Sequence, residues 1–169
     1  MSRAGVVYEL EYEGFVISPM TEHDLLEVVE IEETCGLSLW GWDAYRVELE
    51  RPESIMLAAR QTLSHFDGAR RVSGFVAARV SAGELHINNI GVREEARRRG
   101  LGTKLLGLAL DFGRQAGAGR AILEVRAGNR AAQYLYAGLG FKTAGRRPNY
   151  YRQPVEDALV MTLRLGAGA

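Results

Sequence analysis

The chain has 169 residues, 47% of them hydrophobic and 25% charged, and its 21 basic and 21 acidic side chains give a formal net charge of zero. This composition is typical of a globular protein, and the zero charge argues against a global positive field and a direct nucleic-acid partner. One cysteine, Cys35, excludes an internal disulfide, and no long apolar run or signal-peptide core is present, so we expect a cytoplasmic protein without a membrane partner.

The N-terminal part predicts two short strands and two helices. In order, these are strands over 6–12 and 15–18, a helix opened by residues 21–24 and closed by residues 35–36, and a helix over 43–51. Gly14 separates the two strands. Thr21 is the expected N-cap of the first helix, with Asp24 completing an imperfect capping box. Pro52 limits the second helix.

The rest of the chain alternates strands with helices. The predicted elements are strands over 54–60, 72–80 and 85–92, a helix over 100–116, a strand over 121–126, a helix over 130–137, and closing strands near Phe141 and over 159–165. Asn129 is the expected cap of the helix over 130–137, and Gly138 its end. We expect one α/β domain over 1–169, with a disordered tail at 166–169.

The most informative stretch is 90–104, which reads I-G-V-R-E-E-A-R-R-R-G-L-G-T-K. Gly100 and Gly102 remove Cβ atoms where a helix begins and leaves its first amides without intrahelical partners. Such amides, with the helix dipole, favour an anion such as a pyrophosphate. The same residues also fit a solvated surface turn, so spacing alone leaves both interpretations open. The pattern is neither a P-loop nor a Rossmann fingerprint.

These residues carry a family resemblance. The pattern V-x-x-x-x-R-x-x-G-x-G resembles the acetyl-CoA pyrophosphate loop of GNAT-fold N-acetyltransferases. Segments 123–129, 135–141, 149–151 and 156–158 are similar to the ribosomal-protein-alanine N-acetyltransferases of the RimI type. The resemblance covers roughly residues 15–165. It implies an α/β GNAT fold, a mixed central sheet with helices on both faces, preceded by an additional arm or strand at 1–14.

The resemblance also implies acetyl-CoA as co-substrate. In the family, a bulge near Asn88-Asn89 separates two strands and admits the cofactor. Ile90 and Gly91 would run beside the pantetheine, and the Val92 N–H is our candidate for meeting the thioester oxyanion. The expected cofactor-binding residues are Ile90, Gly91, Val92, Arg97, Arg98, Arg99, Gly100, Leu101, Gly102, Thr103 and Asn129.

Glu124 interrupts the apolar strand A-I-L-E-V. Burying an unpartnered carboxylate is costly, so Glu124 should face a cleft or a cation. One interpretation is a structural salt bridge, with Arg126 on the same strand face as the expected partner. The other is a partly desolvated carboxylate with a raised pKa that accepts a proton. The resemblance matches Glu124 to the family's general base.

The resemblance implies roles for four further residues. Tyr136 matches the general acid that protonates the departing CoA thiolate, and Asn149, Tyr150 and Tyr151 match a segment near the acceptor peptide. The alternative for these last three is a polar turn with aromatic packing. The histidines show no metal-ligand spacing, so we expect no metal site.

The leading hypothesis is acetylation of the α-amine at a protein N-terminus, with alanine of a small-subunit ribosomal protein as the acceptor. A GNAT enzyme acting on a small-molecule amine or a lysine side chain is the alternative, and a non-catalytic CoA-binding module is a third. Two departures from the family concern the acceptor side: residues 152–155 and the arm before Phe15. A third is Glu94, which stands where the family often has proline.

Overall fold

The computed structural model describes residues 8–62 and 68–166. The start of the predicted strand over 6–12 and the end of the predicted tail lie outside these residues. The elements in chain order are β1 (Leu10–Tyr12), β2 (Phe15–Pro19), η1 (Glu22–Asp24), α1 (Leu25–Thr34), α2 (Gly41–Leu49), β3 (Ser54–Thr62), β4 (Arg70–Ser81), β5 (Glu84–Val92), η2 (Glu94–Ala96), α3 (Leu101–Gln115), β6 (Arg120–Arg126), α4 (Arg130–Gly138), β7 (Lys142–Arg152) and β8 (Val155–Arg164).

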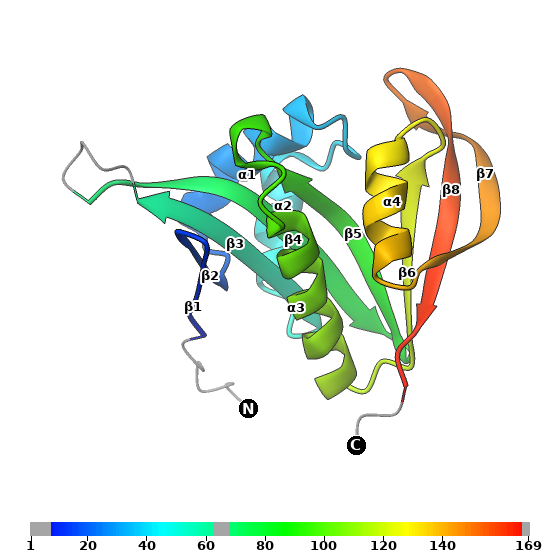
Figure 1. The fold of residues 1–169 in the computed structure, drawn as a ribbon, viewed down its shortest axis with the longest axis horizontal. Coiled ribbons are helices and arrows are strands. Elements are labelled where there is room, and N and C mark those ends of the chain that lie inside the picture. Colours follow the sequence, from blue (N-terminus) through cyan, green and yellow to red (C-terminus); the bar gives the residue numbers. More distant parts are fainter. Residues whose placement is uncertain (1–7, 63–67, 167–169) are drawn as a thin grey trace.

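The strands form one mixed, 8-stranded sheet in the order β1-β2-β3-β4-β5-β6-β8-β7. Neighbouring strands pair antiparallel, except β5 and β6, which are parallel. Figure 1 shows α3 and α4 on the near face of the sheet and α1 and α2 behind it. The predicted mixed sheet with helices on both faces is therefore confirmed.

Each face of the sheet has its own apolar core. The core under α3 and α4 includes Leu85, Leu105 and Leu123, and the core under α1 and α2 includes Ile31 and Phe75. Burial of these side chains holds both helix layers against the sheet. No helix within the described residues combines the length and the apolar character of a membrane span.

The parallel pair β5–β6 is short, and this opens the sheet. Its register runs from Glu84 opposite Arg120 to Ile87 opposite Leu123 and then stops. At the next residue, Asn88, β5 bulges, because Ala77 of β4 pairs with Asn89 while Ala78 pairs with Ile87. The bulge expected at Asn88-Asn89 is thus present. Beyond it, β5 stays with β4 and β6 stays with β8, which leaves a gap between them.

Several boundaries differ from the sequence prediction, and β8 begins at Val155 rather than Leu159. The helix α2 begins at Gly41 rather than Asp43, and the Gly41 N–H donates to Glu32 Oε1 at 3.1 Å. Residues 149–151 belong to strand β7 rather than to a free turn. The pairing of β7 with β8 skips from Arg147 to Tyr151, so this stretch bulges opposite Asp157. A buried acceptor and a partner strand, both distant in sequence, decide these boundaries.

Candidate active site

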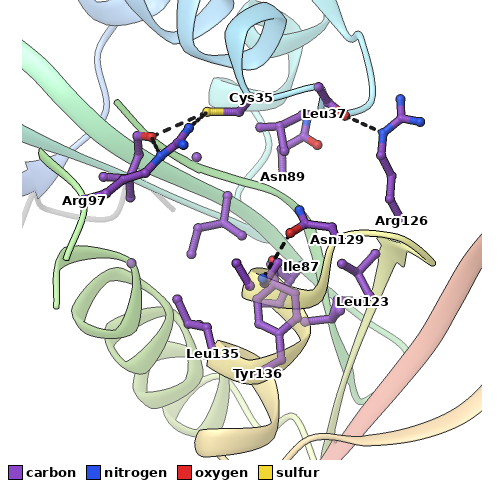
Figure 2. A pocket seen from close by; sticks show the side chains of 18 of the residues that line it. Cys35, Leu37, Ile87, Asn89, Arg97, Leu123, Arg126, Asn129, Leu135 and Tyr136 are labelled. Atoms are coloured by element: carbon purple, nitrogen blue, oxygen red, sulfur yellow. Dashed lines mark hydrogen bonds between the residues drawn. The ribbon is translucent and has the colours of Figure 1, made fainter. Parts of the chain in front are cut away.

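A cavity of about 730 Å³ occupies the gap between β5 and β6. One end lies at the turn before α3, and the other lies beside Glu124, Tyr150 and Tyr151. Figure 2 shows the α1–α2 loop above this space and α4 with Tyr136 below it. The expected cofactor-binding residues that line the cavity are Ile90, Gly91, Val92, Arg97, Arg98, Gly100, Leu101, Gly102, Thr103 and Asn129.

Gly100 and Gly102 shape the turn at the first end. Gly100 is the N-cap of α3 with a φ of 74°, a left-handed conformation that costs other residues free energy. A Cβ on Gly100 would stand 2.6 Å from the Tyr12 hydroxyl, and one on Gly102 would stand 3.1 Å from Leu135 Cδ1. The left-handed φ favours glycine at position 100, and a Cβ at position 102 would require the Leu135 side chain to shift. The first residues of α3 line the cavity, so an anion there would meet the positive end of the helix dipole.

The three adjacent arginines have different roles in the structure. Arg97 lines the cavity, donating from Nε to Val92 O at 3.0 Å and from Nη2 to Cys35 Sγ at 3.4 Å. Arg98 also lines it. The Arg99 side chain points to the N-terminal hairpin instead, where it donates to Glu13 O at 2.5 Å and stacks 4.4 Å from the Phe15 ring centre. Arg99 is therefore not among the residues that line the cavity.

The β1–β2 hairpin braces the outer side of the turn. The Tyr12 hydroxyl donates to Arg99 O at 3.2 Å, and Lys104 Nζ lies 5.7 Å from the Tyr12 ring centre. The described part of the N-terminal arm thus forms an edge strand that contacts the turn before α3. The sequence left open whether this segment adds an edge strand or forms an ordered arm.

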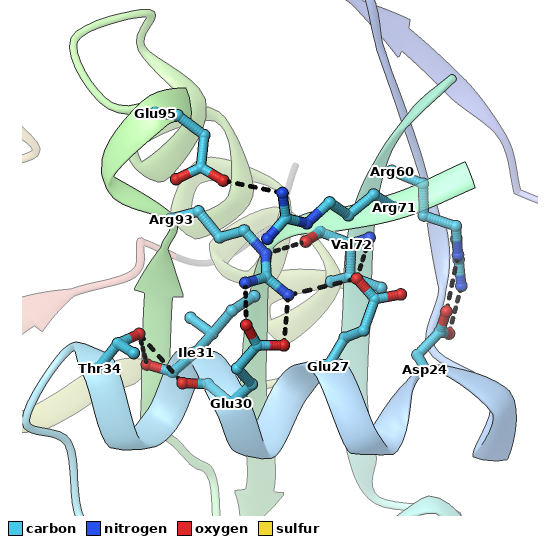
Figure 3. Close-up of polar contacts among 10 residues, drawn as sticks. All are labelled: Asp24, Glu27, Glu30, Ile31, Thr34, Arg60, Arg71, Val72, Arg93 and Glu95. Carbon is cyan, nitrogen blue, oxygen red and sulfur yellow. Dashed lines mark hydrogen bonds and ion pairs between the residues drawn. The ribbon is translucent and has the colours of Figure 1, made fainter. Parts of the chain in front are cut away.

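An ion cluster around one buried arginine fixes the other approach to the turn (Figure 3). Arg93, which follows β5, is only 6% exposed and donates to Glu30 Oε1 at 2.9 Å, Glu27 Oε2 at 3.2 Å and Val72 O at 2.7 Å. The hydrogen bond from Arg93 and its charge hold the pKa of Glu30 below its usual value. The cluster ties the end of β5 to α1. Removing either glutamate would leave the buried Arg93 guanidinium with fewer partners for its charge.

A second polar cluster connects the bulge to the α1–α2 loop. The Asn89 amide donates to Tyr45 Oη at 2.8 Å and to Ser38 O at 3.0 Å. Tyr45 in turn donates to Glu32 Oε2 at 2.5 Å. Glu32 is 1% exposed, so these hydrogen bonds satisfy a carboxylate that burial would otherwise destabilise. The loop that lines one wall of the cavity is therefore fixed to the strand that lines the other.

Glu124 lies at the second end of the cavity with its side chain 8% exposed. Its Oε2 is 2.8 Å from His86 Nε2, and its Oε1 is 3.4 Å from Arg147 Nε. Burial raises the pKa of Glu124, but the His86 hydrogen bond and the charges of His86 and Arg147 together outweigh it, and the pKa falls below the usual value. The expected raised pKa is wrong, because the sequence does not reveal these two neighbours.

Arg126 is not the partner of Glu124 either. Its guanidinium donates to Gly36 O at 2.9 Å in the α1–α2 loop, and to Gln153 O and Pro154 O, both at 3.1 Å, in the β7–β8 turn. It also lies 3.3 Å from Glu156. Figure 2 shows Arg126 reaching toward the loop beside Leu37. Arg126 therefore joins the two segments that border the second end of the cavity.

Tyr136 lies on α4 and lines the cavity from the side of α3 and α4. Its side chain is 7% exposed, and burial, with a smaller effect from Tyr151, raises the pKa of its hydroxyl. The phenol is therefore protonated at neutral pH and available as a proton donor. Asn129 caps α4 as predicted, since its Oδ1 accepts the Ala132 N–H at 3.1 Å. The same cap orients the helix that carries Tyr136.

The predicted acceptor residues separate in the structure. Tyr150 and Tyr151 line the cavity as an edge-to-face pair, with ring centres 5.1 Å apart and an angle of 83° between the ring planes. Burial, followed by smaller charge effects, raises the pKa of Tyr151 to about 12. Asn149 does not line the cavity. Its backbone N–H donates to Asp157 Oδ1 at 2.9 Å with a φ of 50°, so Asn149 shapes the β7 bulge.

His86 and Arg147 are the site residues that sequence reasoning missed. His86 lies 38 residues before Glu124, and no spacing rule connects them. The parallel register of β5 and β6 places His86 opposite Ile122, and that register is the signal that could have revealed the contact. Within the described residues, no group of three or more His, Cys, Asp or Glu side chains could hold a metal ion.

Sequence comparison relates the chain to acetyltransferases. The model of the "Acetyltransferase (GNAT) family" matches residues 25–141. The chain is 34% identical to the "N-alpha-acetyltransferase RimI" of Mycobacterium tuberculosis over 153 residues, 88% of this chain and 92% of that protein. It is 42% identical to the Salmonella typhimurium "[Ribosomal protein bS18]-alanine N-acetyltransferase" over 95 residues, 55% of this chain and 64% of that protein.

Structural comparison agrees. The Escherichia coli ribosomal-protein-S18-alanine N-acetyltransferase superposes with a TM-score of 0.76 at 29% identity, covering 92% of this chain and 96% of that one. The family match spans most of the chain, including the anion-binding turn, β6 and α4. The chain belongs to the GNAT family of acetyltransferases.

Proposed function

We propose that the chain transfers an acetyl group from acetyl-CoA to the α-amine of a protein N-terminus, with the N-terminal alanine of ribosomal protein bS18 as the acceptor. The observation that carries this proposal is a single cavity with an anion-binding turn at one end and Glu124 at the other, with Tyr136 also on its wall. The names of the relatives support the acceptor. A ribosomal acceptor makes the cytoplasm the compartment of the reaction.

The turn fits the pyrophosphate of acetyl-CoA. The first amides of α3 and the side chains of Arg97 and Arg98 offer positive charge where Gly100 removes steric bulk. The C=O of Val92 accepts from Arg97 and Cys35 rather than from β4. In an extended strand, the N–H and C=O of one residue point to the same side. The Val92 N–H therefore also points away from β4, as an oxyanion donor requires.

Acetyl-CoA would supply the acetyl group, activated as a thioester. The ionised Glu124 attracts the ammonium of the acceptor, which has a pKa of about 8 and must lose a proton before it attacks. Tyr136 protonates the sulfur as it leaves. Tyr150 and Tyr151 offer aromatic contacts to the first residues of the peptide.

Incubation with acetyl-CoA and an alanine-initiated peptide tests this function. We expect a mass gain of one acetyl group on the N-terminal fragment in tandem mass spectrometry. A matched peptide with a blocked N-terminus and a free lysine is the control, and it should stay unmodified. Acetylation of that lysine or of small amines, without N-terminal modification, would favour the alternative acceptor. Acetyl-CoA binding without turnover on any amine would identify a non-catalytic module.

A further inference from the structure

His86 is a titratable residue beside the cavity, and the proposed transfer reaction has so far given it no role. Leu85, Ile87 and Leu123 belong to the core under α3 and α4. Side chains alternate along a strand, so His86 of β5 and Glu124 of β6 both point to the opposite face. There the His86 side chain is 44% exposed, while Glu124 is 8% exposed. The His86–Glu124 pair therefore extends from the cavity wall, where Glu124 lies, to the solvent-exposed imidazole of His86.

The contact determines how the imidazole can act. With Nε2 2.8 Å from an ionised Glu124 oxygen, Nε2 carries the hydrogen and donates it. A neutral ring then has its free lone pair on Nδ1. Glu124 is already held by His86 and by Arg147, whose Nε lies 3.4 Å from Oε1, and these contacts favour the ionised carboxylate and make it a weak acceptor for a proton from an ammonium. A carboxylate that orients a histidine is a recurring way to obtain a base active near neutral pH.

We propose that His86 receives the proton of the incoming ammonium at Nδ1, through water, while Glu124 holds the ammonium and stabilises the imidazolium that forms. This proposal rests on the proposed function and extends it. An N–H bond of the ammonium breaks, and its electron pair stays on the amine as the nucleophile. A new N–H bond forms at Nδ1 of His86, and the exposed ring then releases the proton to solvent.

The other charged groups around His86 are already engaged. Arg79 of β4 pairs directly opposite His86 in the sheet, but its guanidinium is bound by Glu48 of α2. Arg147 of β7 contacts Glu124, and Tyr150 of β7 has a pKa raised by burial and then by the Glu124 charge. Among the described groups that face it, Glu124 is the one in contact with the ring and can balance its positive charge.

The variant His86→Gln separates proton transfer from positioning. Its amide can still donate a hydrogen bond to Glu124, but it cannot accept a proton in this pH range. We expect a kcat about 100-fold lower at pH 7.5, at the low end of what a positioned acid–base group contributes. The KM for acetyl-CoA should stay within about twofold, because the anion-binding turn is distant in the cavity.

The pH dependence provides the decisive comparison. The ratio of wild-type to His86→Gln kcat should fall as the pH drops from 8 to 5, the interval in which imidazoles become charged. Both enzymes are compared at saturating peptide, because the ratio reports the base only when both start from the acceptor bound as the ammonium at Glu124. Full activity of His86→Gln, or a reduced activity with a ratio independent of pH, would overturn the proposal, because His86 would then only position Glu124.

A spectroscopic measurement tests the tautomer without any turnover. The ring nitrogen signals of His86, identified by their loss in His86→Gln, should report hydrogen on Nε2 and a bare Nδ1 at pH 7.5. The opposite tautomer would overturn the proposal. If wild-type protein leaves the alanine peptide unmodified, the proposed acceptor is wrong. The kinetic comparison then uses the amine that is acetylated, so the two failures remain distinguishable.

Discussion

The two ends of the cavity are built in different ways. At the turn before α3, consecutive residues form the proposed anion site, and the left-handed φ of Gly100 favours glycine there. At the other end, side chains from β5, β6 and β7 meet at Glu124, and Arg126 joins two loops. The first end depends on local backbone conformation, whereas the second depends on strand register and hairpin packing.

This difference predicts how each end responds to substitution. A change in the turn should alter acetyl-CoA binding and leave acceptor recognition intact. A change at the Glu124 end should alter the proton transfer or the acceptor KM and leave acetyl-CoA binding intact. A change at Tyr136, the proposed proton donor, should alter kcat without altering the binding of either substrate.

The largest effect is expected for Tyr136→Phe. Loss of the phenol removes the proton donor beside the sulfur, and kcat should fall by about 100-fold while the Kd for acetyl-CoA stays constant. Tyr134→Phe is the matched control, because Tyr134 lies on the same helix but is 78% exposed. Steady-state kinetics and calorimetric binding measure both quantities. An unchanged kcat in Tyr136→Phe would contradict its assigned role.

Gly100→Ala should weaken acetyl-CoA binding and leave acceptor recognition intact. The left-handed φ disfavours alanine by about 1–2 kcal/mol, and its Cβ would meet the Tyr12 hydroxyl, so the Kd for acetyl-CoA should rise about tenfold. Gly107→Ala in α3 is the control, because its Cβ meets no atom within 4 Å. That control should raise helix stability by about 0.5–1 kcal/mol. Equal acetyl-CoA affinity in the two variants would argue against a backbone-built anion site.

Arg126→Gln should weaken acceptor recognition at the Glu124 end of the cavity. Loss of the bridge between the α1–α2 loop and the β7–β8 turn should raise the acceptor KM about fivefold, as expected for losing about 1 kcal/mol of net hydrogen bonding. Arg146→Gln is the control, since this 58% exposed arginine pairs with Asp157 at the surface and should change the KM less than about twofold. The prediction fails if the Kd for acetyl-CoA changes instead of the acceptor KM.

The smallest effect concerns stability in acid. The pKa of Glu124 is lowered in the folded state, so its ionised form stabilises the fold above the unfolded glutamate value, about 4.3. This contribution is lost as the pH falls through the lower folded pKa. Urea midpoints of wild type and Glu124→Gln should therefore converge between about pH 5 and pH 3. A constant difference over that range would mean that Glu124 does not titrate as described.

Much of the fold was predictable because its signals are local. The capping box at Thr21 and Asp24 and the cap at Asn129 are present, and the helix after Gly100 begins within one residue of its predicted start. The bulge that the family resemblance implied near Asn88-Asn89 is also present. Each of these features depends on side chains within a few residues of one another.

The site was predictable only in part. The misses share one cause, which is that each depends on a contact outside the motif in which the residue lies. Arg99 looks equivalent to Arg97 in the sequence, but the β1–β2 hairpin draws its side chain away. Asn149 belongs to a bulge opposite Asp157 rather than to the cavity wall. The catalytic roles of Glu124 and Tyr136 stay predictions, and the structure brings both to one cavity.

The sequence by itself determined the helix and strand order, the glycine turn and the family, because backbone preferences and motif spacing are properties of neighbouring residues. Only the tertiary structure decided the environment of Glu124. The parallel register of β5 and β6 brings His86 to its carboxylate, and the β7–β8 hairpin brings Arg147. Electrostatic interactions depend on distance in space, so the direction of that pKa shift could not be read from the order of residues.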